Sequence, residues 1–163
     1  MSAARKRLLF VCLGNICRSP TAEAVMRHLV AEAGLADRIE VDSAGTGSWH
    51  LGYPPDPRSQ AVGRARGMPL SSKARLVKPE DFVRFDYLLA LDRNNFADLQ
   101  RMAPTADGKN RIHLLREFEP GAGKGADVPD PYYGDQEGFE TVFDICLAAC
   151  RGLLPHVQRD LGA

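Results

Sequence analysis

The sequence predicts a three-layer α/β fold, in which helices cover both faces of a doubly wound sheet of four parallel strands. Short apolar runs of strand length alternate along the chain with segments whose apolar residues recur at helical spacing. No internal repeat or linker divides the 163 residues, of which 44% are hydrophobic and 26% charged, as in ordinary globular proteins. We therefore expect one domain over residues 1–163.

The first strand is predicted over residues 7–11, where an apolar run ends at Cys12 and the turn-forming Gly14 follows. Pro20 suits the first turn of a helix, where the N–H group that it lacks has no partner. One face of this helix is expected to be buried, and it consists of Ala22, Val25, Met26, Leu29 and Val30. Residues 12–18 therefore form a loop between the carboxyl end of a strand and the amino end of a helix.

A second short strand is predicted over residues 39–41, and residues 42–46 form the loop beyond its carboxyl end. The proline-rich segment 53–57 interrupts regular structure before a helix over residues 58–66. Because ligands of such sheets bind at the carboxyl ends of the strands, we expect the 42–46 loop to lie near Cys12.

The third and fourth strands are predicted over residues 87–91 and 111–115. Asp92 follows the third strand and is well placed to cap the next helix. The final helix has an apolar face that consists of Phe139, Val142, Phe143, Cys146, Leu147 and Cys150. Pro155 is expected to kink or end this helix.

The loop between the first strand and the first helix combines residue types that suit a tetrahedral dianion. Unpaired amides and the dipole at a helix amino terminus favour negative charge, which favours the thiolate form of Cys12. Arg18 can bind two phosphoryl oxygens as a bidentate fork, and Ser19 can donate a hydrogen bond to the sulfur. These residues indicate phosphoryl transfer through a cysteinyl-phosphate. The alternative is a buried cysteine at a strand end with an incidental surface arginine.

The backbone of this loop can also bind the phosphoryl group. Gly14 and Asn15 tolerate left-handed backbone angles, which let successive N–H groups point inward as an anion nest. The phosphate-binding residues are therefore predicted to be Leu13, Gly14, Asn15, Ile16, Cys17 and Arg18.

Asp130 is the candidate proton donor. Displacing a phenolate from phosphorus requires a proton at the departing oxygen, and a carboxyl group can later take a proton from the attacking water. Pro131 confines Asp130 to an extended backbone, which limits where the carboxyl group points. Taken alone, such a segment is more often an ordinary Asp-Pro turn followed by two surface tyrosines.

Residues 12–20 resemble the signature of the low-molecular-weight protein-tyrosine phosphatases, and three further segments are similar in the family's order: 42–46, 81–92 and 130–134. The resemblance implies strand order 2-1-3-4 and a phosphatase that acts on phosphotyrosine proteins and small aryl phosphates. It implies that Cys12, Arg18 and Asp130 are catalytic. Phosphate and other tetrahedral oxyanions are then expected to inhibit the enzyme.

The same resemblance assigns supporting roles to Ser19, Ser43 and Asp92, and substrate binding to Trp49, Tyr132 and Tyr133. These three aromatic residues would hold the phenyl ring of the substrate, although partial packing is the alternative for Trp49. Many family members carry a histidine where this chain has Ser72. Support for the hydrogen bonds between Ser43 and Asn15 is therefore expected to be missing or supplied by water.

Related activities remain as alternatives. Arginine-phosphate phosphatases resemble this family but favour threonine at the position of Ile16, and arsenate reductases of the same fold need further cysteines between Cys17 and Cys146, where this chain has none. A non-catalytic phosphate-binding module would need neither Cys12 nor Asp130. By resemblance, Cys17 can capture oxidised Cys12 in a reversible disulfide, and a purely structural thiol is the alternative.

Composition limits the partners. The formal net charge is zero, so we expect neither a nucleic acid nor a membrane as a partner. The histidines lack metal-ligand spacing, and we predict no metal and no cofactor. No secretion signal, transmembrane run or disulfide framework is visible, which predicts a cytoplasmic protein, and we expect a monomer. Cys146 and Cys150 are predicted to be core residues.

Overall fold

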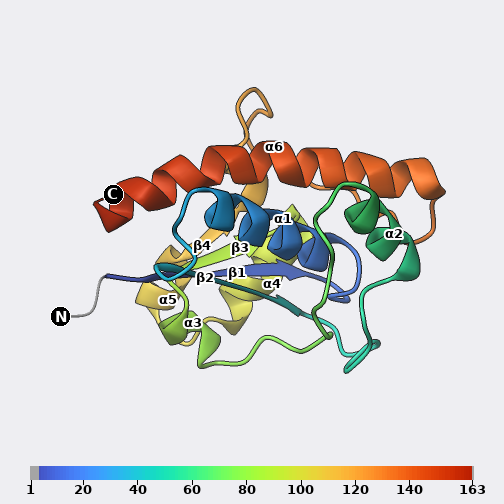
Figure 1. Cartoon of the computed structure of the whole chain (residues 1–163). Coiled ribbons are helices and arrows are strands. Elements are labelled where there is room, and N and C mark those ends of the chain that lie inside the picture. Colours follow the sequence, from blue (N-terminus) through green and yellow to red (C-terminus); the bar gives the residue numbers. More distant parts are fainter. Residues whose placement is uncertain (1–3, 163) are drawn as a thin grey trace.

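The computed structural model describes residues 4–162, and its centre is a sheet of four parallel strands (Figure 1). In chain order the strands are β1 (Lys6–Cys12), β2 (Ile39–Gly45), β3 (Tyr87–Ala90) and β4 (Ile112–Leu114). Their order across the sheet is β2-β1-β3-β4, which confirms the predicted fold class and the order 2-1-3-4. The chain moves from β1 to one side and then to the other, so the topological switch point lies between β1 and β3.

Helices cover both faces of the sheet (Figure 1). One face carries α1 (Arg18–Glu32), α2 (Pro57–Ala65) and the long α6 (Gln136–Leu161). The opposite face carries α3 (Asp81–Arg84), α4 (Arg93–Met102) and α5 (Ala106–Asn110). A short 3-10 helix, η1 (Leu115–Phe118), follows β4.

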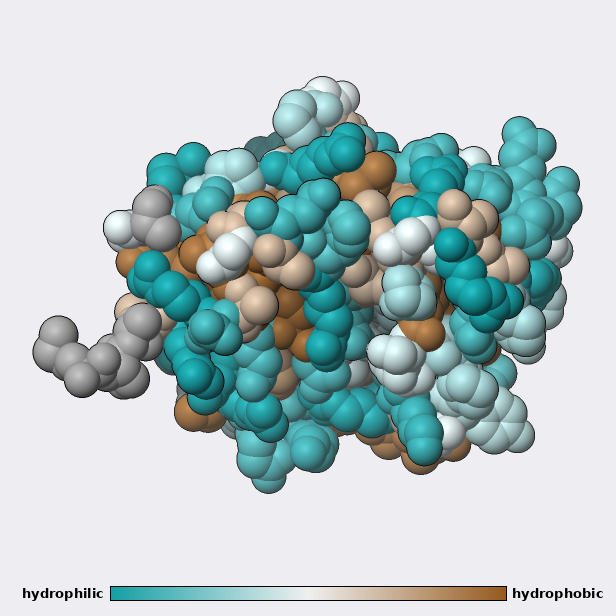
Figure 2. Space-filling view, viewed as in Figure 1, coloured by the Kyte–Doolittle hydropathy of each residue, from teal (hydrophilic) through white to brown (hydrophobic). Residues whose placement is uncertain are grey.

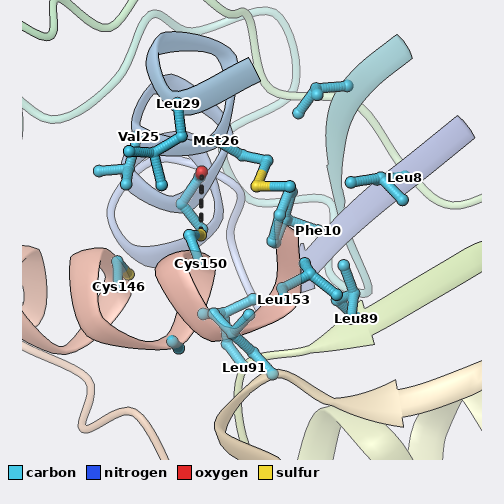
Figure 3. Packing of buried hydrophobic residues seen from close by; sticks show 14 of the residues in the cluster. Leu8, Phe10, Val25, Met26, Leu29, Leu89, Leu91, Cys146, Cys150 and Leu153 are labelled. Carbon is cyan, nitrogen blue, oxygen red and sulfur yellow. Dashed lines mark hydrogen bonds between the residues drawn. The ribbon is translucent and has the colours of Figure 1, made fainter. Parts of the chain in front are cut away.

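The side chains of β1 enter two hydrophobic cores in turn, because neighbouring residues of a strand point to opposite faces of the sheet. Phe10 belongs to the core beneath α1 and α6, whereas Leu9 belongs to the core beneath α3 and α4. Figure 3 shows the first core, where Phe10 lies against Met26 of α1 and α6 closes the other side. Cys146 and Cys150 of α6 are fully buried in this core, as predicted.

The second strand is longer than the sequence pattern predicts. β2 runs through Gly45, so most of the segment 42–46 is strand rather than loop. The reason is its pairing with β1, which continues along the whole of β1 until Cys12 lies opposite Gly45. The buried side chain of Ser43 is therefore held on a rigid element.

Pro155 does not end the last helix, which continues for six residues to Leu161. Proline removes the hydrogen bond to the carbonyl group of Arg151, one turn earlier. Both residues are exposed, so water can satisfy that carbonyl group without a break in the helix. The other predicted boundaries agree with the structure to within one residue at β1, α2, β3 and β4.

Hydrophilic side chains cover most of the face shown in Figure 2, and hydrophobic ones appear in separate patches between them. Among the described residues, every helix is too short or too polar to span a lipid bilayer.

Candidate active site

Cys12 is the last residue of β1, and residues 12–18, which we call the phosphate loop, lead from it into α1. Carbonyl groups of this loop accept hydrogen bonds from backbone amides elsewhere in the chain. Thr46 N–H donates to the Cys12 carbonyl at 3.0 Å, and Asp56 N–H donates to the Ile16 carbonyl at 2.8 Å. Because these carbonyls are bound by neighbouring segments, the amides of the loop can face an anion.

Asn15 gives the phosphate loop its shape. Its φ of 56° makes it the one non-glycine residue with a positive φ among residues 4–162. Gly14 and Asn15 both tolerate left-handed angles, and of the two only Asn15 adopts one. Gly14 instead leaves room for His50, whose ring would lie 3.0 Å from a Cβ atom at position 14.

The sulfur of Cys12 is almost completely buried and makes two polar contacts. It lies 3.0 Å from the hydroxyl oxygen of Ser19, and the backbone N–H of Asn15 donates to it at 3.3 Å. The Asn15 amide nitrogen, Nδ2, donates to the same Ser19 hydroxyl at 2.8 Å. The Ser19 hydroxyl can donate its own hydrogen to the sulfur or to the Ala44 carbonyl, which is farther away at 3.5 Å. Ser19 therefore occupies the place that the sequence predicts.

A second chain of hydrogen bonds supports the loop from behind. Asn15 Nδ2 donates to the Ser43 hydroxyl at 3.0 Å, and Ser43 donates to the buried carboxylate of Glu23 at 2.5 Å. Burial raises the pKa of Glu23, and the hydrogen bond from Ser43 and the nearby Arg27 oppose this increase. Ser72 takes no part: its hydroxyl is buried and has no hydrogen-bond partner among the described residues. Asn15 and Ser43 are linked without it.

Arg18 is buried at the first position of α1 and is held by acidic and backbone groups. Its Nη1 donates to Asp92 at 2.5 Å and to the Val128 carbonyl at 3.1 Å, and its Nη2 lies 3.6 Å from Asp130. Burial acts to lower the pKa of Arg18, but Cys12 and Asp92 outweigh it, so the pKa is raised above its ordinary value. Arg18 therefore stays cationic beside the sulfur.

Asp92 has two roles at the end of β3. As predicted, its carboxylate caps α4 by accepting a hydrogen bond from the backbone of Asn95 at 2.7 Å. The other carboxylate oxygen binds Arg18. The helix cap thus fixes the carboxylate that orients the guanidinium group.

Asp130 lies in a segment without regular structure, residues 128–134, which we call the acid loop. The carboxylate oxygen Oδ1 accepts a hydrogen bond from the backbone N–H of Tyr132 at 3.1 Å. The side chain is 47% exposed, so it can exchange protons with solvent while it faces Arg18.

These groups surround a pocket of about 440 Å³. The predicted site residues that line it are Cys12, Leu13, Gly14, Ile16, Cys17, Arg18, Trp49, Asp130, Tyr132 and Tyr133. Of the remaining predicted residues, Asn15 and Ser19 contact Cys12 and Asp92 contacts Arg18. Ser43 contacts Asn15 and so supports the lining indirectly. Residues from five separated parts of the sequence thus converge on one site.

The pocket rim is aromatic and largely exposed. Trp49 is 70% exposed, yet its ring lies over Gly47, where a Cβ atom would clash with it. The rings of His50 and Tyr132 are 5.8 Å apart, and those of Tyr132 and Tyr133 are 4.9 Å apart. An aromatic substrate ring can therefore find flat apolar partners on both sides of the pocket.

Comparison with known proteins decides the family. Residues 7–163 match the family model described as low molecular weight phosphotyrosine protein phosphatase. The chain belongs to this family. A relative from Streptomyces coelicolor, named low molecular weight protein-tyrosine-phosphatase, is 47% identical over 156 residues, which cover 95% of each chain.

Solved structures agree with the match. A protein tyrosine phosphatase from Entamoeba histolytica, with Hepes in its active site, is 41% identical and has a TM-score of 0.91, covering 95% of this chain and 98% of that one. An arginine phosphatase from Drosophila is 35% identical with a TM-score of 0.86, covering 93% and 97%. The chain is thus a phosphatase, and the fold alone does not separate phosphotyrosine from phosphoarginine.

Several residues at the phosphatase site are not predicted as site residues from the sequence. His50, next to Trp49, lines the pocket. Glu23 could have been suspected as a charged residue within the buried face of α1, four residues after Ser19. Asp56 and Arg58 carry no comparable signal, because their contacts are distant in the sequence.

All four cysteines are free thiols. Burial is the main cause that raises the pKa of Cys17 to about 12, and burial raises the pKa of Cys146 to a similar value. Among residues 4–162 no group of three histidine, cysteine or acidic side chains could hold a metal ion.

Proposed function

We propose that this phosphatase hydrolyses phosphotyrosine in proteins, and small aryl phosphates, with Cys12 as nucleophile, Arg18 as the phosphate-binding cation and Asp130 as general acid. One observation carries the proposal: a sulfur, a guanidinium group and a carboxyl group border the same pocket. A module that only bound phosphate would need the cation and the amides alone. The sulfur and the carboxyl group add the nucleophile and the proton donor of a two-step displacement.

In the first step the Cys12 thiolate attacks phosphorus in line with the departing oxygen. The new sulfur–phosphorus bond forms as the phosphorus–oxygen bond breaks, and Asp130 transfers its proton to the phenolate. Arg18 and the loop amides bind the three equatorial oxygens, on which negative charge is spread. Asp92 keeps the guanidinium in place for this contact.

In the second step water attacks the cysteinyl-phosphate and Asp130, now ionised, takes a proton from that water. The sulfur leaves as a thiolate, which the hydroxyl of Ser19, 3.0 Å away, can stabilise.

Removing the general acid should slow the hydrolysis of substrates with poor leaving groups by about a hundredfold or more, since general acids contribute roughly 10²–10⁴ to the rate. Activated aryl phosphates should be affected far less in Asp130→Ala.

The pocket favours phosphotyrosine over shorter phosphoamino acids. Trp49 and Tyr133 line the pocket and offer aromatic faces to a phenyl ring, and Ile16 of the phosphate loop contributes an apolar contact. Phosphate and other tetrahedral oxyanions should compete for the same loop and inhibit the enzyme.

The test compares four substrates: p-nitrophenyl phosphate, a phosphotyrosine peptide, a phosphoserine peptide and phosphoarginine. We expect turnover of the first two, and hydrolysis of phosphoarginine faster than of phosphotyrosine would overturn the substrate assignment. Cys12→Ser should abolish turnover while the circular dichroism spectrum is unchanged. Cys150→Ala is the control: it removes a buried thiol outside the pocket lining and should retain turnover.

We further propose a single domain over residues 1–163, of which 1–3 and 163 lie outside the described residues, and the family match over 7–163 supports this. Free thiols support a reducing, cytoplasmic environment. A monomer is proposed, because Trp49 and Tyr133, two of the exposed large hydrophobic residues, line the pocket that a protein substrate must reach. The formal net charge of zero supports the absence of nucleic-acid and membrane partners. Light scattering of the purified chain tests the monomer.

A further inference from the structure

Arg58 connects α2 to the acid loop, although it is not among the described residues that line the pocket. Its Nε and Nη2 donate to the two carboxylate oxygens of Asp56, at 3.0 and 2.9 Å. The same Nη2 donates to the backbone carbonyl of Tyr132 at 3.0 Å. The bidentate pair fixes the direction of the planar guanidinium, so the bond to Tyr132 has a defined geometry.

The Arg58 guanidinium also lies over two aromatic rings. Its central carbon is 4.4 Å from the ring centre of Phe139 on α6 and 5.6 Å from that of Tyr132. Arg58 thus combines a bidentate pair, a bond to a backbone carbonyl and cation–π contacts, which a lysine could not reproduce.

Asp56 anchors this pair to the phosphate loop. Its backbone N–H donates to the Ile16 carbonyl at 2.8 Å, and its carboxylate caps α2 by accepting from the Arg58 backbone at 2.9 Å. Hydrogen bonds from Arg58 lower the pKa of Asp56, so the carboxylate stays ionised at neutral pH. The pair is therefore fixed relative to the loop that would hold the phosphoryl group.

The opposite end of the connection reaches the general acid. The carbonyl group of Tyr132 accepts from Arg58, and the N–H group of the same residue donates to Asp130 Oδ1 at 3.1 Å. Asp130 has no helix or strand of its own to hold it. A continuous set of hydrogen bonds thus leads from the Ile16 carbonyl to the carboxyl group of Asp130.

We propose that Arg58 is a positioning residue for the general acid: it holds Tyr132 so that the carboxyl group of Asp130 faces the departing oxygen above Cys12. This inference rests on the proposed function, because it assigns Arg58 to the proton-transfer part of that reaction. It concerns the leaving-group step and not the binding of phosphate.

The competing explanation is that Arg58 only joins α2 to α6, and Arg66 provides the matched control. Arg66 follows the last residue of α2, and its side chain is 34% exposed against 37% for Arg58. It packs on an α6 ring, 4.7 Å from Phe143, and pairs with Glu140 and Asp144 of the same helix. The hydrogen-bond and aromatic partners of the Arg66 side chain all belong to α6, so this side chain joins the same two helices without contacting the acid loop.

The experiment measures kcat/KM for a series of aryl phosphates whose leaving groups differ in basicity, in Arg58→Met and Arg66→Met. Methionine keeps an unbranched apolar side chain on the α6 ring but removes the hydrogen bonds. Arg58→Met should lose about tenfold on phenyl phosphate, a part of the roughly 10²–10⁴ that a general acid supplies, and about twofold or less on p-nitrophenyl phosphate. Arg66→Met should keep the wild-type ratio of the two rates.

A double variant separates positioning from stability. If Arg58 acts through Asp130, adding Arg58→Met to Asp130→Asn should cause no further loss on phenyl phosphate. Equal slowing of both substrates by Arg58→Met, or additive losses in the double variant, would overturn the inference. Arg58→Lys keeps the positive charge, but an ammonium group cannot form the bidentate pair with Asp56 and the bond to the Tyr132 carbonyl together. It should show the same selective loss on phenyl phosphate. It also provides a second variant if Arg58→Met does not fold.

The same data distinguish this inference from the proposed function. If Asp130→Asn does not change how kcat/KM depends on the basicity of the leaving group, Asp130 is not the general acid and both proposals fail. If Asp130→Asn steepens that dependence and the two Arg58 variants do not, only the role of Arg58 fails.

Discussion

Asn15 shows how much of the site depends on one residue. Its side chain donates to Ser19 and Ser43, and its side-chain oxygen accepts from the backbone of Arg75 at 3.0 Å. Its backbone adopts the left-handed conformation and donates to the sulfur of Cys12. Both the orientation of the Ser19 hydroxyl and the curvature of the phosphate loop therefore depend on Asn15.

Substituting Asn15 should separate these two contributions. Asn15→Gly and Asn15→Ala both lose the side-chain bonds, so both should reduce kcat, through disorientation of Ser19. Only alanine is strained at a φ of 56°, and we expect Asn15→Ala to be less stable than Asn15→Gly by about 1 kcal/mol. Urea unfolding measures the difference, and equal stability of the two variants would show that backbone strain is unimportant here.

Cys17 provides a prediction about oxidation. If peroxide converts Cys12 to a sulfenic acid, the Cys17 thiolate can attack that sulfur, form a disulfide and expel hydroxide, which takes a proton from solvent to become water. Because burial raises the pKa of Cys17 to about 12, its thiolate fraction should rise about tenfold per pH unit below that value. Recovery of activity by a reductant should therefore increase from pH 7 to pH 9.

Cys17→Ala is the control for this experiment. It should lose activity irreversibly at both pH values, whereas Cys150→Ala should behave like the wild type. Irreversible loss in the wild type, no slower than in Cys17→Ala, would exclude a protective disulfide.

At the scale of elements, apolar periodicity predicts the buried strands and the covering helices well, since burial is what creates that pattern. It fails at β2, where Asp42 and Ser43 look like the start of a loop. Ser43 can lie in a buried strand because Asn15 and Glu23 satisfy its hydroxyl, and those partners come from other elements. A pattern read along one segment cannot include them.

His113 in β4 makes a prediction about pH. Burial lowers its pKa below the ordinary value of 6.5, and Glu117 only partly opposes this. The unfolded chain then binds more protons than the folded one below about pH 6.5, so the stability present above that pH is lost as the pH falls. The free energy of unfolding, measured in urea at pH 7.5 and 5.5, should fall less in His113→Gln than in the wild type.

His28→Gln, at a partly exposed histidine of α1, is measured beside His113→Gln as the control for losing a histidine outside β4. If the unfolding free energy depends on pH in the same way in His113→Gln and in the wild type, His113 is not the source of the pH dependence.

At the scale of the whole molecule, parallel strands bring Cys12, Asp92 and the end of β2 to one edge of the sheet, and this could be predicted from the order of elements. The contact between Arg58 and Tyr132 joins residues 74 positions apart and involves a loop with no regular structure. Neither spacing nor composition encodes such a contact. Residues with distinctive chemistry are therefore predictable, whereas a contact between distant segments such as that of Arg58 with Tyr132 is not.

The long helix α6 closes the core behind the site, and Leu153 tests its contribution. Leu153 is fully buried (Figure 3), so Leu153→Ala should cost about 2–5 kcal/mol of unfolding free energy. The neighbouring Leu154 is only partly buried, and Leu154→Ala should cost less than half as much. Similar losses in both would show that α6 does not pack as described.

The central claim is that the phosphoryl group passes through Cys12. The most direct measurement is a rapid acid quench of the enzyme with a phosphotyrosine peptide that carries radioactive phosphate, followed by peptide mapping of the labelled protein. The account predicts transient label on the peptide that contains Cys12, and none in Cys12→Ser. Label on any other residue, or turnover that releases phosphate without a labelled protein, would contradict it.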